Sequence, residues 1–124
     1  TYSGIPCAVA AGLAMQDIFE KEDLINRSKE MSPYFLDGLF TLKDIDGVTD
    51  IRGYGMMGGI DLRIDERPGK AGYNCFKSLF AAGLSLKATG DCLIVAPPFI
   101  SEKKHIDEII DKLRTGITNY FKEQ

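Results

Sequence analysis

The chain has 124 residues, of which 44% are hydrophobic and 27% charged, and its formal net charge is −3 at pH 7. This balance predicts one globular domain and argues against disorder. Lys and Arg are scattered along an acidic chain, so nucleic acid is not an expected partner. No apolar run approaches the roughly 20 residues of a bilayer span and no secretory signal opens the chain, so we expect a cytoplasmic protein without membrane contact.

The first third of the chain predicts two helices. Pro6 stands at a tolerated first-turn position, and the following CAVAAGLAMQDIFEKE is rich in Ala, Leu and Met. This composition predicts a largely buried helix. A second, broken helical stripe of apolar residues runs from about Leu24 to Lys43, and Pro33 suggests a bend near its first turns.

Two short runs, VTDIRGYG and MMGGIDLRI, then follow each other with almost no spacer, which favours a β-hairpin. They contain a literal G-x-G-x-x-G at Gly53, Gly55 and Gly58, the spacing of a dinucleotide-binding turn. That motif needs a helix directly after the turn, whereas GIDL after Gly58 reads as a strand. We therefore expect the glycines to form a tight turn and to allow close packing, and a nucleotide-binding domain is the least favoured interpretation.

The second half of the chain predicts a helix over 71–83 with Gly83 as its C-cap, then a strand pair, LSLKA and CLIVA, and a final helix over 102–121 with Ser101 as N-cap. The apolar face of that last helix comprises Ile106, Ile109, Ile110, Leu113, Ile117, Tyr120 and Phe121. This order of elements predicts an α+β two-layer sandwich, in which helices cover one face of a mostly antiparallel sheet.

Cysteine and histidine offer little chemistry on their own. Cys7, Cys75 and Cys92 form an odd set without C-x-x-C spacing, which suggests free thiols and neither a disulfide framework nor a zinc site. His105 is the sole histidine and stands where a first helical turn is expected. A solvated side chain is the simplest interpretation of it.

Several segments together resemble one family. TYSGIP at 1–6 with CAVAAGLAMQDI, then DIRGYGMMGGIDL, LSLKATGDCLIVAPPFI and the last helix, resemble in this order the class III aminotransferases, the ω-amino-acid transaminases that use pyridoxal phosphate. The resemblance covers essentially the whole chain. It implies that residues 1–124 are a single domain, the C-terminal small domain of a homodimeric fold type I enzyme. The first residue is not Met, which suits a piece of a longer protein.

The resemblance also implies roles for particular residues. Thr1 matches a threonine that donates to the cofactor phosphate across the dimer interface, and Ile5 stands where the family usually has His or Asn. Lys87, ten residues before Pro97, falls where many ω-transaminases carry a mobile arginine that holds the substrate carboxylate. Lysine keeps that charge but loses the planar fork of arginine. The alternative for Lys87 is a solvated cation at a strand end.

The implied activity is transfer of an amino group from an amine or ω-amino acid to a keto acid such as pyruvate. The Schiff-base lysine would lie upstream of Thr1, so we assign no catalytic residue here and expect this fragment to be inactive alone. Glutamate-semialdehyde aminomutases and acetylornithine or diamine transaminases share the fold, which leaves the exact reaction open. A free-standing α+β binding or regulatory module is the alternative from another functional class.

Overall fold

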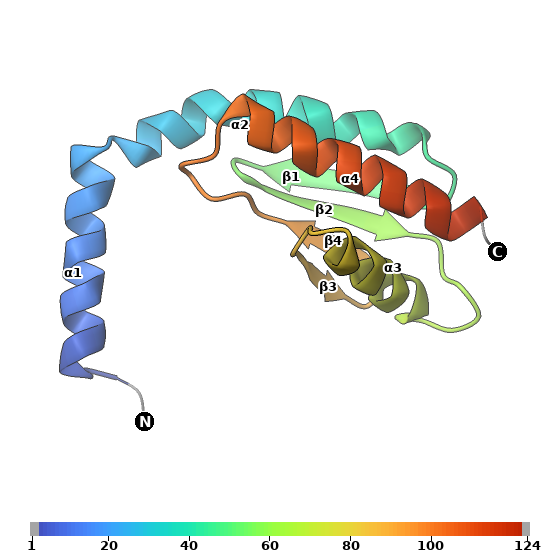
Figure 1. Ribbon diagram of the computed structural model, residues 1–124, viewed down its shortest axis with the longest axis horizontal. Helices are drawn as coiled ribbons and strands as arrows, with labels where there is room; N and C mark the ends of the chain where they lie inside the picture. The colour runs from blue at the N-terminus through green and yellow to red at the C-terminus, as the bar shows by residue number, and fades with distance from the viewer. Residues whose placement is uncertain (1–2, 123–124) are drawn as a thin grey trace.

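The computed structural model describes residues 3–122, and Figure 1 shows their arrangement. The elements in chain order are α1 (Pro6–Lys21), α2 (Leu24–Phe40), the 3-10 helix η1 (Thr41–Asp44), β1 (Val48–Tyr54), β2 (Met57–Leu62), α3 (Lys70–Ala81), β3 (Lys87–Thr89), β4 (Cys92–Val95) and α4 (Lys103–Lys122). No helix within 3–122 combines the length and the apolar character that crossing a bilayer requires.

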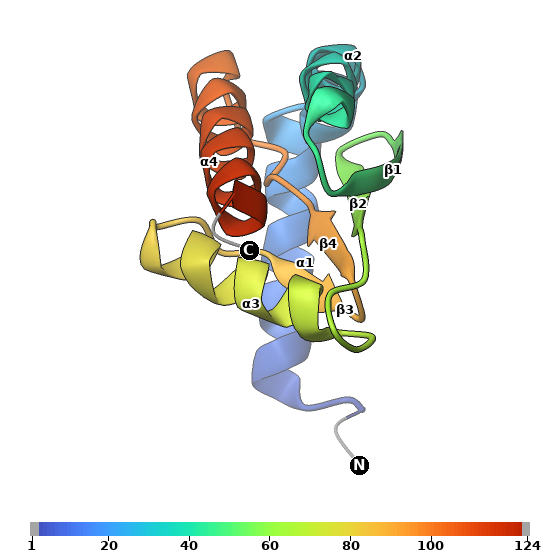
Figure 2. The same ribbon diagram turned by 90° about the vertical axis from the view of Figure 1, so that its right-hand side faces the viewer.

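The four strands form one sheet in the order β1-β2-β4-β3, and every neighbouring pair is antiparallel. Helices α2, α3 and α4 pack on one face of it, as Figure 2 shows from the side. The predicted two-layer α+β sandwich is therefore confirmed. Its core lies between the layers, and its largest fully buried side chains are Phe35, Leu39, Leu42, Ile60, Leu79, Leu93, Ile106, Leu113, Ile117 and Cys75.

The expectation that the first helix is largely buried is wrong for this chain. Helix α1 projects away from the sandwich in Figure 1, and none of its residues is buried. Val9, Leu13 and Met15 are exposed to 51%, 60% and 52%. The composition predicted an apolar helix correctly. For the helix to be buried, another element must also pack against it. Only the end of α1 carries a ring contact to the sandwich, where Phe19 meets Phe99 edge to face with centroids 5.8 Å apart.

The glycines of the hairpin allow α2 to pack closely on the sheet. Gly55 has φ 59° and forms the tight turn, while Gly58 lies in β2 and not at a helix N-terminus. A Cβ at Gly58 would overlap the side chain of Leu39 on α2, and one at Gly53 would crowd Leu36. The prediction that the residues after Gly58 form a strand is confirmed. The side chains that lie close to Gly53 and Gly58 are leucines of α2.

The helix ends differ from the sequence predictions by one to three residues. Helix α2 continues through Pro33 but stops at Phe40, and the last predicted turn is the 3-10 helix η1. The C-cap of α3 is Ala82, one residue before the predicted Gly83. Gly83 follows it with φ 81°, and the N–H of Leu84 donates to the Leu79 carbonyl at 2.9 Å, which is a Schellman ending.

The prediction of Ser101 as the N-cap of the last helix is wrong by one residue. The Glu102 carbonyl accepts from the backbone N–H groups of His105, at 2.9 Å, and Ile106, at 3.2 Å, so Glu102 is the cap. Ser101 is buried just before it. The exposed His105 side chain has a local role, because its Nδ1 accepts the Glu102 N–H at 3.0 Å, as Glu or Gln does in a capping box.

Candidate functional site

The sheet has one face that the described helices do not cover, which we call the open face. Alternation along the strands assigns to it Arg52, Met57, Gly59, Asp61, Lys87, Thr89, Cys92 and Ile94. Strand register pairs Lys87 with Ile94, Ile94 with Gly59, and Gly59 with Arg52. One row of residues therefore crosses the whole sheet, with a cationic residue at each end.

The cation at the β1 end of this row is neutralised within the chain. Arg52 donates from Nη1 to Asp61 Oδ2 at 2.5 Å and from Nη2 to Asp61 Oδ1 at 3.1 Å, which is a bidentate ion pair between neighbouring strands. The hydrogen bond from Arg52 lowers the pKa of Asp61, so the carboxylate stays ionised at neutral pH. Arg52 is thus already engaged and leaves little charge for a substrate.

A thiol lies beside this ion pair. Cys92 Sγ is 3.6 Å from Arg52 Nη2, and the pKa of Cys92 is raised, first by burial and then by its hydrogen bond with Asp61. The thiol is therefore kept protonated. Arg52 and Cys92, together with Tyr54, Met57 and other residues of the open face, line a shallow groove of about 560 Å³. The sequence offers no sign of this cluster, because its members come from β1, β2 and β4.

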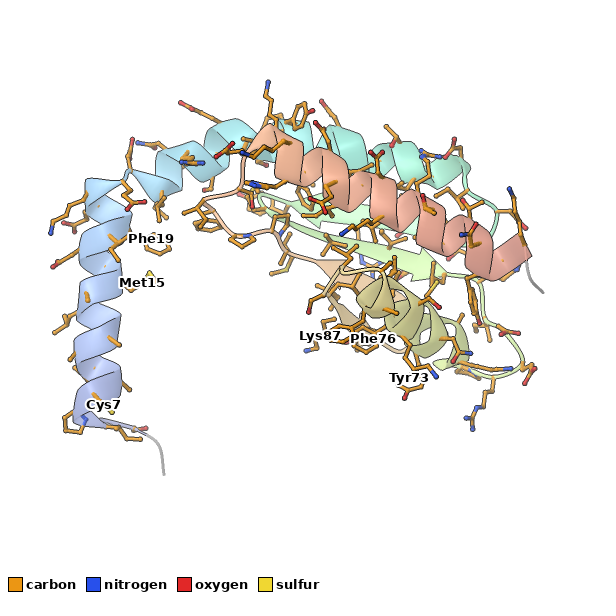
Figure 3. All side chains as sticks on the ribbon, viewed as in Figure 1. Cys7, Met15, Phe19, Tyr73, Phe76 and Lys87 are labelled. Carbon is orange, nitrogen blue, oxygen red and sulfur yellow. The ribbon has the colours of Figure 1, made fainter. Side chains whose placement is uncertain are left out.

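The cation at the β3 end of the row is different. The side chain of Lys87 is exposed and forms no ion pair or hydrogen bond with any of the residues 3–122. Its neighbour Ala88 pairs with the buried Leu93, so Lys87 faces away from the helix layer. Figure 3 shows Lys87 at the same end of the molecule as Tyr73 and Phe76 of α3, which packs against β3. Its position suits a ligand, and its role stays a prediction.

The other predicted site residue, Thr1, lies outside the described residues, so its role also stays a prediction. The neighbouring motif is described from Ser3 onward. Ile5 is the N-cap of α1 and makes no side-chain capping bond, and Pro6 occupies the first helical position. In Figure 1 the first turn of α1 lies far from β3, so the structure does not bring the described part of this motif to the strand that carries Lys87.

Asp91 is a residue whose contacts the sequence does not reveal. It follows Gly90 in the turn between β3 and β4. Its Oδ2 accepts the backbone N–H of Gly69 at 2.7 Å, and its Oδ1 accepts that of Gly72 at 3.1 Å. Asp91 therefore caps the N-terminus of α3 from another part of the chain. These contacts span 22 and 19 residues, beyond the reach of any local pattern.

The three cysteines are free thiols, as expected, and differ widely in exposure. Burial raises the pKa of the Cys75 thiol to about 12, whereas Cys7 is exposed on α1. With iodoacetamide at pH 8 and this 124-residue chain, we expect Cys75 to react about a hundredfold more slowly than Cys7. Mass spectrometry of timed digests measures this, with Cys7→Ser as control. Equal rates at the two positions in the native chain would contradict the burial of Cys75.

Comparison with known proteins identifies the family. The aminotransferase class-III family model matches residues 1–117. An omega-aminotransferase of Caulobacter vibrioides is 37% identical over 92% of this chain and 26% of its own length. A beta-alanine–pyruvate aminotransferase of Pseudomonas aeruginosa is 34% identical over 90% of this chain and 25% of its own length. The chain thus spans about a quarter of these curated relatives.

Solved structures agree with the sequence comparison. The structure of a transaminase with L-alanine superimposes with a TM-score of 0.89 at 26% identity, over 95% of this chain and 30% of that one. An adenosylmethionine-8-amino-7-oxononanoate aminotransferase from Methanocaldococcus jannaschii gives 0.80 at 34% identity, over 88% and 26%. The sandwich therefore matches part of the fold of fold type I transaminases. On the family match and these likenesses, the chain belongs to the class III aminotransferases.

Proposed function

We propose that this chain is the C-terminal small domain of a pyridoxal-phosphate-dependent class III transaminase. The longer enzyme transfers an amino group from an amine or ω-amino acid to a keto acid such as pyruvate. Two relatives support this choice within the family by name, the beta-alanine–pyruvate aminotransferase and an omega-amino acid–pyruvate aminotransferase of Pseudomonas putida, which is 36% identical over 90% of this chain. A cytoplasmic location stays a prediction from the sequence.

The exposure of α1 supports a longer protein. The helix carries no charged residue from Pro6 to Gln16, yet its apolar side chains face solvent in this chain. Contiguous apolar surface of this kind is usually covered by another domain or subunit. In the proposed enzyme the large domain, which carries the Schiff-base lysine, lies upstream and covers α1. The 124-residue chain alone is then inactive.

The separation of the first turn of α1 from β3 supports a dimer. The TYSGIP motif leads into the first turn of α1, whereas Lys87 begins β3, and Figure 1 places these two elements far apart. In a homodimer that distance is no obstacle, because Thr1 serves the cofactor of the partner subunit across the interface. Lys87 then faces substrate at a different place. One chain therefore contributes to two active sites.

The chemistry of these side chains fits the cofactor and the substrates. The hydroxyl group and the backbone N–H of Thr1 can both donate hydrogen bonds, and phosphate oxygens can accept them. When bound, pyridoxal phosphate supplies the electron sink for amino transfer. The ammonium group of Lys87, which has no partner among residues 3–122, receives a substrate carboxylate and orients the rest of the molecule. Arg52 is a weaker candidate, because Asp61 already occupies its guanidinium fork.

Replacing Lys87 in the full-length enzyme tests the proposal. We expect Lys87→Met to raise KM for pyruvate about tenfold, because one charge-assisted hydrogen bond to the carboxylate is lost. KM for 1-phenylethylamine is expected to change less than about twofold, because this amine donor has no carboxylate for Lys87 to contact. Lys87→Arg retains the charge and serves as the matched control. Steady-state kinetics with each substrate varied measures both values.

Two outcomes would overturn the proposal at different levels. An equal rise of both KM values would show that Lys87 does not recognise the carboxylate. Absence of amino transfer from every amine or ω-amino acid donor tried, in the full-length protein with pyridoxal phosphate, would remove the transaminase assignment itself. The free-standing binding module would then become the leading alternative.

A further inference from the structure

The strand that carries Lys87 has few anchors of its own. β3 contains only three residues, lies at the edge of the sheet and, within residues 3–122, pairs only with β4. An edge strand this short is held weakly by backbone hydrogen bonds, so contacts outside the sheet decide where its side chains lie. The turn that joins β3 to β4 provides those contacts.

Asp91 ties this turn to α3 through two charge-assisted hydrogen bonds. Its carboxylate accepts the N–H groups of Gly69, the N-cap of α3, at 2.7 Å, and of Gly72, in its first turn, at 3.1 Å. The helix dipole favours a negative charge at this end. The carbonyl of the same residue accepts the N–H of Leu62 at 2.8 Å, so Asp91 also joins the turn to the end of β2.

Backbone packing at the same place is an independent observation. A Cβ at Gly72 would overlap the carbonyl oxygen of Gly90 and would lie 3.0 Å from the Asp91 Cα. The first turn of α3 and the β3–β4 turn therefore touch backbone to backbone, which only glycine at position 72 permits. Helix α3 also packs along β3 and β4. The turn is thus held from the side of the helix as well as from the side of the sheet.

We propose that Asp91 is a positioning residue for Lys87. By fixing the β3–β4 turn on α3, it sets where β3 lies and so where the ammonium group meets the substrate carboxylate. This inference rests on the proposed function for the role of Lys87, whereas the anchoring of β3 by Asp91 is testable without it.

The kinetic test uses the full-length enzyme. Asp91→Ala is expected to raise KM for pyruvate about fivefold while kcat and KM for 1-phenylethylamine change less than about twofold. Asp91→Asn keeps a side-chain acceptor and is expected to restore most of the affinity. Gly72→Ala disturbs the same contact from α3 and is expected to reproduce the Asp91→Ala pattern. Ile106→Val, in the core contact of α4, controls for general loss of stability.

A double variant separates positioning from a general effect. In a Lys87→Met background, Asp91→Ala is expected to change KM for pyruvate no further, because there is no ammonium group left to position. An undiminished effect in that background would overturn the proposal. An equal rise of both KM values in Asp91→Ala alone would overturn it as well.

Hydrogen exchange gives a measure that does not depend on activity. In Asp91→Ala, backbone amides of residues 86–92 and of the first turn of α3 are expected to exchange faster, while those of α4 keep their rates. Unchanged exchange over 86–92 would overturn the anchoring role. If Lys87→Met leaves KM for pyruvate unchanged, the proposed role of Lys87 fails, and this exchange measurement decides on Asp91 by itself.

Discussion

Replacing Phe35 by alanine is expected to lower the free energy of unfolding by about 3–5 kcal/mol. Phe35 has an exposed fraction of 0% and belongs to the core between α2 and the sheet. Removing the ring loses the free energy gained when the ring is transferred from water into the core. It also leaves a cavity that the packed core fills only in part. Urea unfolding followed by circular dichroism measures the change. A loss of this size is a large fraction of the stability of a small domain.

Phe40→Ala is the matched control for this prediction. Phe40 lies at the end of the same helix but is 45% exposed, so we expect a loss below about 1.5 kcal/mol. Comparing the two variants cancels any effect on the free energy of unfolding that every Phe→Ala change in α2 would share. Equal losses for the two variants would contradict the position of α2 on the sheet, because the burial of Phe35 depends on that packing.

Gly58→Ala is expected to destabilise the fold by about 1–3 kcal/mol, through overpacking and not through a cavity. The backbone of Gly58 is not left-handed, so the effect is steric: the new methyl group would overlap Leu39. α2 must then lift from β2 or Leu39 must leave its rotamer. Both responses disturb the contact between the helix layer and the hairpin. Urea unfolding measures this change too.

The next residue in the chain supplies the control. Gly59 faces the opposite side of the sheet, where an added Cβ would meet Cys92 Sγ at 3.3 Å, a neighbour that is free to move slightly. We expect Gly59→Ala to change the free energy of unfolding by less than about 0.5 kcal/mol. A larger loss at 59 than at 58 would mean that the two faces of β2 are reversed.

The open face separates two cations that the sequence alone would treat alike. Arg52 and Lys87 both lie on strands and share one row of the sheet, but Asp61 neutralises the first, whereas the second has no partner within residues 3–122. At the proposed substrate position, a lysine offers a point charge without the bidentate fork of arginine. For the proposed enzyme this predicts looser discrimination between substrates with and without a carboxylate.

Local pattern predicts most of the elements correctly. The apolar face of the last helix, the turn at Gly55 and the helix stop at Gly83 follow from periodicity and from backbone freedom within a few residues. The same reasoning predicts that the first helix forms, but it does not predict its exposure. An apolar composition indicates that a helix can pack against another apolar surface, but it does not show that such a surface is present. Nothing within residues 3–122 covers α1.

Periodicity, turn residues and segments that resemble a family are enough to predict the secondary structure, the α+β class and the class III aminotransferase assignment. Only the folded chain reveals that Asp91 caps α3, that Asp61 neutralises Arg52 and that Leu39 requires a glycine at 58. The difference is one of range along the chain. Helix and turn preferences act over about four residues, whereas these contacts join separate elements and exist only once the helix layer has packed on the sheet.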